Sequence, residues 1–370
     1  MTGSPRENRA STAVANLHRA AAGLGLLVLL LLAAELTIRV EDWVRFRTPL
    51  GPSLKDQSEL SVLDATGRHP APGSSFGKWQ INSVGTRGPE PDPDKTATRV
   101  LVVGASETFG LYESPNREYP RQLADSLDAS HCPADVLNAG FIGMSLPTVE
   151  QDLRLRLKAL TPRLVVYYPT PPQYAEEIPV AVVPAPSGGG SSPVPSWHLR
   201  FLPRAYSQLK SMIPALSDAL RQRDIARQRA EKPAGWVYET IPREHLDAFD
   251  LDLRRLVGTV RGIGAIPILV THANGFTGTP PMGGKILRAW ERFYPRATGD
   301  ALVTFDSVAA ERIRRIGTDS GVTVVDVWRA FHGVNAPQLF ADFSHFTDRG
   351  AARMASLLQP AVSQALGCRK

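Results

Sequence analysis

Three residue types that together activate a serine hydroxyl occur in this chain at positions that a fold could bring together. Ser106 lies in the segment Gly104–Gly110, of sequence GASETFG, directly after the apolar run Val100–Val103. Asp342 and His345 lie far downstream in the run LFADFSHF. A serine hydroxyl becomes a strong nucleophile only when a base takes its proton, and the base needs an acceptor that fixes its tautomer. The pattern therefore predicts a Ser-His-Asp triad, provided that the fold joins the three side chains.

The elements that must position these residues alternate between apolar strands and helices. Strands are predicted at 99–104, 135–139, 163–168, 266–271 and 322–327, and helices near 116–129, 147–160, 242–263, 301–319 and 347–366. Continuous runs of Val and Leu separated by helices indicate a parallel sheet that is buried on both faces. We therefore predict an α/β fold, a three-layer doubly wound domain with a parallel five-stranded sheet.

In such a sheet, reactive groups collect at the carboxyl ends of the strands. Ser106 follows the first strand, His272 the fourth, and the pair Asp342 and His345 the fifth. A separation of three residues lets Asp342 accept a hydrogen bond from one imidazole nitrogen of His345 while the other nitrogen faces Ser106. For His272 and nearby Asn274, a structural or pocket-lining role is favoured over competition for the role of base.

Simpler interpretations of the same residues stay open. Ser106 could be an ordinary helix N-cap, and His345 could be a capping or core histidine. The nucleophile elbow of the α/β-hydrolases is Gly-x-Ser-x-Gly, and Thr108 stands where its last glycine would be. The eight histidines are too dispersed for a metal cluster, so we expect neither a metal nor another cofactor.

Across about residues 98–367, the chain resembles the SGNH hydrolases, also called the GDSL esterase/lipase family. The resemblance rests on GASETFG at 104–110, NAGFIG at 138–143 and DFSH at 342–345. It implies a flavodoxin-like domain with Ser106 as nucleophile, His345 as general base and Asp342 as the acid that orients the base. It also implies an oxyanion hole formed by the backbone amides of Ser106 and Gly143.

Two positions depart from the family pattern. Ala105 stands where the first block usually has Asp, a change that members with a looser glycine-serine pattern tolerate. The third block usually carries an Asn that donates to the oxyanion, but the run YYPTPPQY at 167–174 contains none. Thr170, Gln173 or Tyr174 could donate instead, and loss of one donor can cost about two to three orders of magnitude in rate. Slow catalysis, a different acyl chemistry and a non-catalytic role therefore stay open.

An apolar segment precedes this domain. Ala20–Ala34 contains only Ala, Gly, Leu and Val, and Leu36–Ile38 extends it past a single Glu35. A helix of this length approaches the roughly 20 residues that a bilayer requires. Candidate cleavage sites place Leu31 or Leu32 where a small residue is needed, so we favour an uncleaved anchor over a removed signal peptide or a buried helix.

The expected organisation has four parts. These are a cytoplasmic tail at 1–17, a transmembrane signal anchor at 18–38, a juxtamembrane connector with short strands at 39–97, and a hydrolase-like domain at 98–368 with insertions at 169–240 and 273–299. The first insertion could cover the active site or pack beside it. Positive charges on the two sides of the anchor are nearly balanced, and only Glu41 and Asp42 favour a cytoplasmic N-terminus. We expect a single-pass protein of the inner membrane with a periplasmic or otherwise extracytoplasmic catalytic domain.

The two cysteines bear on the compartment. Cys132 precedes the second predicted strand and Cys368 ends the last helix, so both lie at the amino edge of the sheet. A possible disulfide between them would imply an oxidising compartment, although two free thiols are the equally simple interpretation.

Composition and charge bound the remaining functions. The chain has 370 residues with 43% hydrophobic content, which is enough to bury a full core. Its net charge of +6 is carried by scattered basic residues without a recognised nucleic-acid motif, so we expect no nucleic-acid partner. The leading hypothesis is a serine esterase that hydrolyses carboxylic esters on acylated carbohydrate or lipid. The alternatives are an O-acyltransferase of envelope polysaccharide and a non-catalytic envelope binding or assembly protein; the oligomeric state is not predicted.

Overall fold

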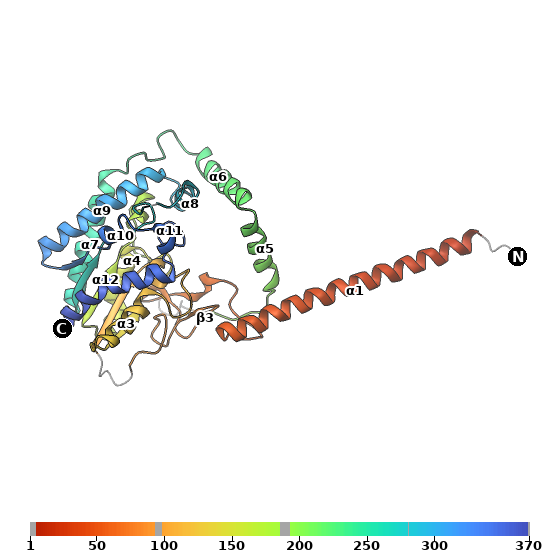
Figure 1. The fold of residues 1–370 in the computed structure, drawn as a ribbon, viewed down its shortest axis with the longest axis horizontal. Coiled ribbons are helices and arrows are strands. Elements are labelled where there is room, and N and C mark those ends of the chain that lie inside the picture. Colours follow the sequence, from red (N-terminus) through yellow and green to blue (C-terminus); the bar gives the residue numbers. More distant parts are fainter. Residues whose placement is uncertain (1–4, 93–97, 186–192, 280, 369–370) are drawn as a thin grey trace. The chain divides into compact units, whose positions relative to one another are not determined.

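The computed structural model describes residues 5–92, 98–185, 193–279 and 281–368. The chain divides into a smaller unit, Met1–Lys55 with Val194–Pro214, and a larger unit, Asp56–Pro193 with Ala215–Lys370 (Figure 1). The larger unit contains the central sheet and all the predicted catalytic residues. The Gly/Ser run at 187–192, within the predicted insertion at 169–240, lies outside the described residues.

The central sheet has five parallel strands, as predicted. They are β5 (Thr98–Gly104), β6 (Ala134–Asn138), β7 (Leu164–Tyr168), β8 (Ile266–Val270) and β9 (Thr323–Val325). Their order β6-β5-β7-β8-β9 is that of the flavodoxin-like doubly wound fold, so the predicted fold class is confirmed. β9 ends two residues before the predicted end because Asp326 caps the short helix α10 (Val327–Phe331) by accepting from the Arg329 amide.

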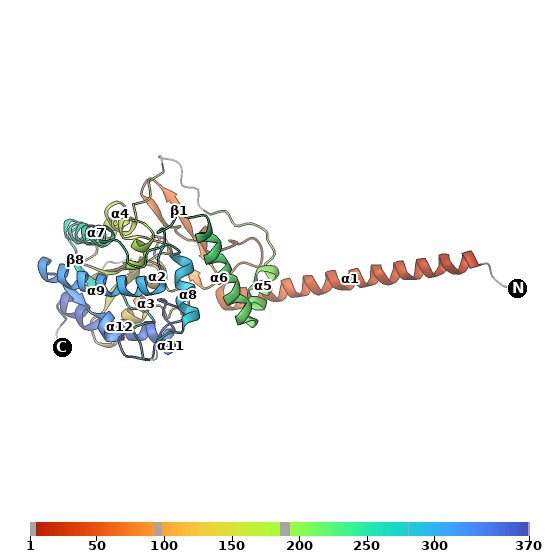
Figure 2. The ribbon, with the colours of Figure 1, turned by 90° about the horizontal axis from the view of Figure 1, so that it is seen from above.

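Helices cover the sheet on two faces (Figures 1 and 2). On one side α3 (Tyr119–Ala129) packs against α12 (Asp348–Leu366), while on the other α4 (Leu146–Leu155) packs against α7 (Arg243–Gly262), which also contacts α9 (Gly299–Ser320). Alternate strand residues such as Val100 and Val102 belong to the core beneath α3 and α12. The residues between them point to the opposite layer because side chains alternate along a strand, which explains the uninterrupted apolar runs.

Shorter elements complete the larger unit. They are η1 (Gln57–Leu60), β1 (Ser61–Asp64), β2 (Gly67–Pro70), β3 (Ser75–Phe76), β4 (Trp79–Gln80), α2 (Ser106–Phe109), η2 (Leu157–Leu160), η3 (Pro171–Ala175), α8 (Gly284–Phe293) and α11 (Ala336–Leu339). The helix predicted near 147–160 is in fact two pieces, α4 and η2. The segment after the third strand includes α6 (Pro214–Ala230), most of which belongs to this unit.

A disulfide joins Cys132 to Cys368, whose Cα atoms are 5.8 Å apart. It connects the residues just before β6 with the residues just after α12. Both cysteines therefore lie at the amino edge of the sheet, where parallel topology places a strand's start beside a helix's end.

The smaller unit is built around one long helix, α1 (Pro5–Phe46), together with α5 (Phe201–Met212). Within α1, the stretch Asn16–Phe46 is long and apolar enough to cross a membrane, and its leucines are exposed. Glu35, the acidic residue that interrupts the apolar run, is buried within this unit. Its carboxylate pairs with Arg39 at 2.8 Å and accepts the backbone amide of Phe201 at 2.9 Å. The charge of Glu35 is thus compensated within this unit.

Candidate active site

The nucleophile segment is a tight turn between β5 and the four-residue helix α2. A Cβ atom at Gly104 would lie 2.6 Å from the carbonyl oxygen of Tyr168, and one at Gly140 would lie 2.9 Å from the backbone nitrogen of Phe109. Only glycine fits at either position. The Thr108 side chain fills the space beside both glycines and hydrogen-bonds the Tyr119 hydroxyl at 2.8 Å. The packing of this turn explains the glycines and the threonine of the first two motifs.

The structure places Ser106, His345 and Asp342 in one hydrogen-bonded chain. The Ser106 hydroxyl lies 2.9 Å from His345 Nε2, and His345 Nδ1 lies 2.9 Å from both carboxylate oxygens of Asp342. Asp342 Oδ1 also accepts the backbone amides of Ser344 at 3.0 Å and His345 at 2.9 Å. The carboxylate therefore folds its own loop and orients the imidazole at the same time.

Burial and charge act on the His345 imidazole in opposite directions. The residue is only 7% exposed, and burial by itself lowers its pKa. The hydrogen bond to Asp342 and the negative charge of Glu107 outweigh burial, so the pKa of His345 is raised above its usual value. The Tyr112 ring packs edge-on against the imidazole, with ring centroids 5.5 Å apart.

Glu107, which the motifs did not single out, is a buried carboxylate beside the triad. It accepts the Ser344 hydroxyl at 2.9 Å and the Thr170 hydroxyl at 3.1 Å, and it lies 3.4 Å from the Ser106 hydroxyl. The residue is 2% exposed. The available signal in the sequence was a charged residue in a turn that directly follows a fully buried strand.

His272 and Asn274 lie in the interior behind Glu107, so of the two roles predicted for them their burial supports the structural one and not the lining of a substrate pocket. Both are at most 1% exposed, and both bind the buried Asp306, through His272 Nδ1 at 2.7 Å and Asn274 Nδ2 at 2.6 Å. His272 Nε2 lies 3.9 Å from Glu107 Oε1 and has no hydrogen-bond partner. The physical reason is Asp306 on α9, which holds the two side chains inside the protein.

Charges within this interior group support one another. Burial raises the pKa of Glu107, but the imidazoles of His272 and His345 outweigh that effect and lower it to about 2. Burial lowers the pKa of His272, yet the carboxylates of Asp306 and Glu107 raise it to about 9. At neutral pH, an anionic Glu107 therefore lies between the triad and a cationic His272.

The predicted oxyanion donors can be located in part. Gly143 has a positive φ of 72°, a backbone conformation that favours glycine, and Arg68 Nη1 donates to the preceding carbonyl of Ile142 at 3.0 Å. Thr170 gives its single hydroxyl proton to Glu107, so in this arrangement it has none for an oxyanion. Gln173 donates to the Met144 carbonyl at 3.0 Å.

The remaining candidate for the missing Asn is also engaged. The hydroxyl proton of Tyr174 goes to Asp252 at 2.7 Å. Thr170 and Tyr174 have thus given their single hydroxyl protons to carboxylates, whereas Gln173 has a second amide proton besides the one given to Met144.

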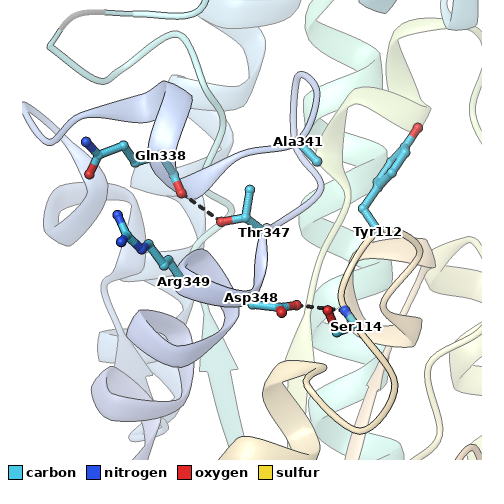
Figure 3. Close-up of a pocket in the computed structure, with 7 residues that line it drawn as sticks. All are labelled: Tyr112, Ser114, Gln338, Ala341, Thr347, Asp348 and Arg349. Carbon is cyan, nitrogen blue, oxygen red and sulfur yellow. Dashed lines mark hydrogen bonds between the residues drawn. The ribbon is translucent and has the colours of Figure 1, made fainter. Parts of the chain in front are cut away.

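A cavity of about 460 Å³ lies beside the catalytic loop (Figure 3). Its lining consists of Tyr112, Ser114, Gln338, Ala341, Thr347, Asp348 and Arg349. Ala341 and Thr347 flank the Asp-x-x-His segment, and Tyr112 contacts His345, so the cavity adjoins the triad. Figure 3 shows the polar side chains of Gln338 and Arg349 on the side of the cavity opposite Tyr112.

Among the described residues, no group of three or more His, Cys, Asp or Glu side chains could hold a metal ion. The interior group of His272 and Asp306 contains one histidine and one acidic residue bonded to each other. Asp306 in that group binds His272 Nδ1 through one oxygen and Asn274 Nδ2 through the other.

Neither protein-family models nor curated proteins match this chain. Solved structures similar to it include a GDSL-like lipase from Bacteroides thetaiotaomicron (15% identity, 75% of this chain and 93% of the other, TM-score 0.39). A lipase/acylhydrolase from Enterococcus faecalis is 12% identical over 74% of this chain and 99% of the other, with a TM-score of 0.43. A catalytic mutant of an acetylxylan esterase from Geobacillus stearothermophilus is 16% identical over 74% of this chain and 97% of the other, with a TM-score of 0.40. Because these TM-scores lie below 0.5, we take the fold from this chain's own strand order and the function from its own site geometry.

Proposed function

We propose that this chain is a membrane-anchored serine esterase of the SGNH hydrolase type. The observation that carries the proposal is the hydrogen-bonded chain from Ser106 through His345 to Asp342. Ser106 and His345 are 239 residues apart in the sequence, and the fold brings them together at one edge of the sheet. Such an arrangement of hydroxyl, imidazole and carboxylate is what nucleophilic acyl transfer requires.

In the proposed reaction, Ser106 Oγ attacks the ester carbonyl carbon while its proton moves to His345 Nε2. The new C–O bond forms as the carbonyl π electrons move to the oxygen, and the backbone amides of Ser106 and Gly143 stabilise that oxyanion. Collapse of the intermediate breaks the ester C–O bond, and the departing alcohol takes the proton from His345. Water then attacks the acyl-serine with His345 as base, which releases the carboxylic acid and restores Ser106.

Asp342 supports both steps without moving. Its carboxylate holds His345 Nδ1–H, so that Nε2 is free to accept the Ser106 proton. It also lies beside the imidazolium that forms in each half-reaction and stabilises that charge. Because two backbone amides fix the same carboxylate, the loop carries its catalytic geometry with little reorganisation.

The cavity beside the loop supports an acylated carbohydrate as the substrate class over a lipid ester. Gln338, Thr347 and Arg349 supply hydrogen-bonding groups, and Tyr112, which is 55% exposed, supplies an aromatic face. Pockets for lipid chains are lined mainly by apolar side chains, whereas five of the seven residues that line this cavity are polar or charged and only Tyr112 and Ala341 are not. The apolar helix α1 and the disulfide support an inner-membrane protein whose catalytic domain lies outside the cytoplasm.

An O-acyltransferase is the second candidate. It would use the same acyl-serine, but a sugar hydroxyl would replace water in the second step. The cavity lined by Tyr112, whose ring packs against His345, favours this candidate, because a hydroxyl bound there would lie near the base that must deprotonate it.

The test uses the full-length chain in detergent micelles. Wild type and Ser130→Ala, a substitution at the exposed C-cap of α3, should hydrolyse p-nitrophenyl acetate and be labelled by a fluorophosphonate probe. Ser106→Ala should lose both reactions. A folded wild-type protein that shows neither reaction would refute the esterase and support a non-catalytic envelope protein.

Product analysis separates the two enzymes. With an acetylated xylo-oligosaccharide and a second, unacetylated oligosaccharide present, an esterase releases acetate and leaves the second sugar unmodified. Transfer of most acetyl groups to the second sugar would instead establish the acyltransferase.

A further inference from the structure

Glu107 connects every segment that contributes to the triad. It lies next to Ser106 in the nucleophile turn and accepts the hydroxyl of Ser344 from the loop that contains Asp342 and His345. Its other oxygen accepts the hydroxyl of Thr170, which follows β7. A fully buried carboxylate is costly unless it is paired, so its presence here calls for a role that an apolar residue could not fill.

The Glu107 carboxylate lies close to the imidazole that acts as base. The Ser106 hydroxyl is 3.4 Å from Glu107 Oε2 and 2.9 Å from His345 Nε2, so it lies between the two groups. Glu107 Oε2 and His345 Nε2 are therefore at most about 6 Å apart, close enough for their charges to interact. The other groups that act on the charge of His345 are Asp342 in its own loop and Glu113 in the segment after α2.

Behind Glu107 lies a counter-charge that keeps it ionised. His272 Nε2 is 3.9 Å from Glu107 Oε1, and Asp306 holds the other nitrogen of the same ring. The carboxylate-imidazole-carboxylate sequence Glu107, His272, Asp306 leads from the triad into α9. It lets a buried carboxylate next to Ser106 remain negative across the neutral range, in agreement with its pKa of about 2.

We propose that Glu107 is a positioning residue that gives His345 a second negative partner and ties the nucleophile turn to the Asp342–His345 loop. This role rests on the proposed esterase function. When His345 takes the Ser106 proton, the imidazolium forms between two carboxylates, Asp342 and Glu107, instead of one. The second carboxylate makes His345 a stronger base and stabilises both transition states that carry its positive charge.

The size of the effect follows from Coulomb's law. Two unit charges about 6 Å apart at an effective dielectric of about 20 shift a pKa by roughly two units, and exposure to solvent reduces that value. Removal of the Glu107 charge should therefore lower the pKa of His345 by about 0.5 to 2 units. Because His345 must be neutral to accept a proton, the acidic limb of the kcat/KM profile should move to lower pH by the same amount.

The experiment compares Glu107→Gln with Thr170→Val in the full-length protein. Gln keeps the size of the side chain but removes the charge, whereas Thr170→Val removes a hydrogen bond to the same carboxylate and leaves its charge in place. We expect the acidic limb to move only in Glu107→Gln. An unmoved limb in Glu107→Gln, or an equal shift in both variants, would overturn the proposal.

An NMR titration of the His345 imidazole separates this proposal from the proposed function. In wild type, His345 should titrate above the ordinary histidine value of about 6.5, and in Glu107→Gln it should titrate lower than in wild type. This readout does not need esterase activity, so an inactive wild type would refute the esterase and still decide the role of Glu107. Should Glu107→Gln fail to fold, a wild-type value at or below the ordinary one would itself reject the proposal.

A separate observation concerns the oxyanion hole. Arg68, on strand β2 outside the central sheet, donates Nη1 to the carbonyl oxygen of Ile142 at 3.0 Å. Its guanidinium also lies over the ring of Phe141, 5.1 Å from the centroid. The Ile142 carbonyl and the Gly143 amide belong to one planar peptide unit, so a cation bound at the oxygen polarises the N–H at the other end.

We infer that Arg68 is a positioning residue for the Gly143 amide and offsets the loss of the family's Asn donor. The charge-assisted bond fixes the orientation of the peptide and strengthens its N–H as a donor. Like the previous proposal, this one rests on the proposed esterase. Its effect should appear mainly in the transition state, because the oxygen of the substrate carries full charge only there.

The test compares Arg68→Met and Arg68→Lys with Arg121→Met, which removes a half-buried arginine of α3 that pairs with Asp125 on the same helix. Arg68→Met should lower kcat by about 10- to 100-fold with little change in KM, and it should weaken inhibition by a boronic acid in proportion. Arg68→Lys should recover part of the loss, and Arg121→Met should behave as wild type. A kcat for Arg68→Met within about twofold of wild type, or a change confined to KM, would contradict the inference.

The Gly143 amide itself supplies a readout that is independent of catalysis. Its proton chemical shift should change in Arg68→Met and remain unchanged in Arg121→Met. No change in Arg68→Met would reject the inference even if the protein is not an esterase.

Discussion

The disulfide between Cys132 and Cys368 should be a major source of stability for the larger unit. It joins residues separated by 236 positions, so it closes almost the whole domain into one loop. In the chain-entropy model, a cross-link across that separation stabilises the fold by roughly 5 kcal/mol relative to the reduced chain. The value is an upper bound, because residual structure in the unfolded chain reduces the entropy that the cross-link removes.

The perturbation is Cys132→Ser combined with Cys368→Ser, compared with wild type under oxidising and reducing conditions. Urea unfolding of the full-length protein in detergent can be followed by tryptophan fluorescence. With a slope of about 3 kcal/mol/M, the loss of roughly 5 kcal/mol lowers the midpoint by about 1.5 to 2 M. Reduction should lower the midpoint of wild type to a similar extent and leave the double variant unchanged.

The outcome separates the cross-link from the packing of the cysteines. Cys132 is only 1% exposed, so a buried serine hydroxyl could destabilise the variant by itself. Agreement between reduced wild type and the double variant would assign the loss to the cross-link. A midpoint that changes by less than about 0.3 M on reduction would refute the reasoning.

Three further predictions concern the interior beside the site. Burial lowers the pKa of His272, but the carboxylates of Asp306 and Glu107 together outweigh burial and raise it to about 9. The stabilisation of the fold by this shift is therefore complete below the unfolded value of about 6.5 and is lost as pH rises through 9. The free energy of unfolding, measured with urea, should therefore fall by roughly 3 kcal/mol over that interval, and Asp306→Asn should flatten this dependence. Phe346→Ala removes a fully buried ring that contacts four other aromatic rings, and it should cost about 3 to 5 kcal/mol in urea unfolding; a loss under 1 kcal/mol would show that the site collapses around the cavity. Gly104→Ala places a Cβ against the Tyr168 carbonyl and should destabilise by about 1 to 3 kcal/mol, measured in the same way, whereas Gly258→Ala, with open space at its Cβ, should be neutral or stabilising.

The periodicity of the sequence was sufficient to predict the sheet. A strand covered by helices on both faces has to be apolar at every position, so Val100–Val103 and Leu164–Tyr168 are recognisable without tertiary information. The doubly wound topology then places the residues after each strand at one edge. The neighbourhood of Ser106 and the Asp342–His345 loop follows from these two facts alone.

Local spacing also determined the internal geometry of the catalytic loop. The Asp342 carboxylate accepts the backbone amides of Ser344 and His345, two and three positions later. The same turn brings this carboxylate to His345 Nδ1. A turn of this kind depends on near neighbours in the chain, so it could be predicted from their identities.

The tertiary structure decided the roles of the residues around the triad. His272 follows β8 at the catalytic edge, but its partner Asp306 lies 34 residues later on α9, and that pairing turns the ring inward. Thr170 gives its proton to Glu107, 63 residues earlier, so its availability to an oxyanion depended on a contact that no local pattern records. Strand order sets where a residue emerges from a sheet, whereas the direction of a side chain beyond the strand's end depends on which distant charges meet it there. For that reason the sequence by itself determined the fold and the placement of the three triad residues, and only the packed structure determined the charges that surround them.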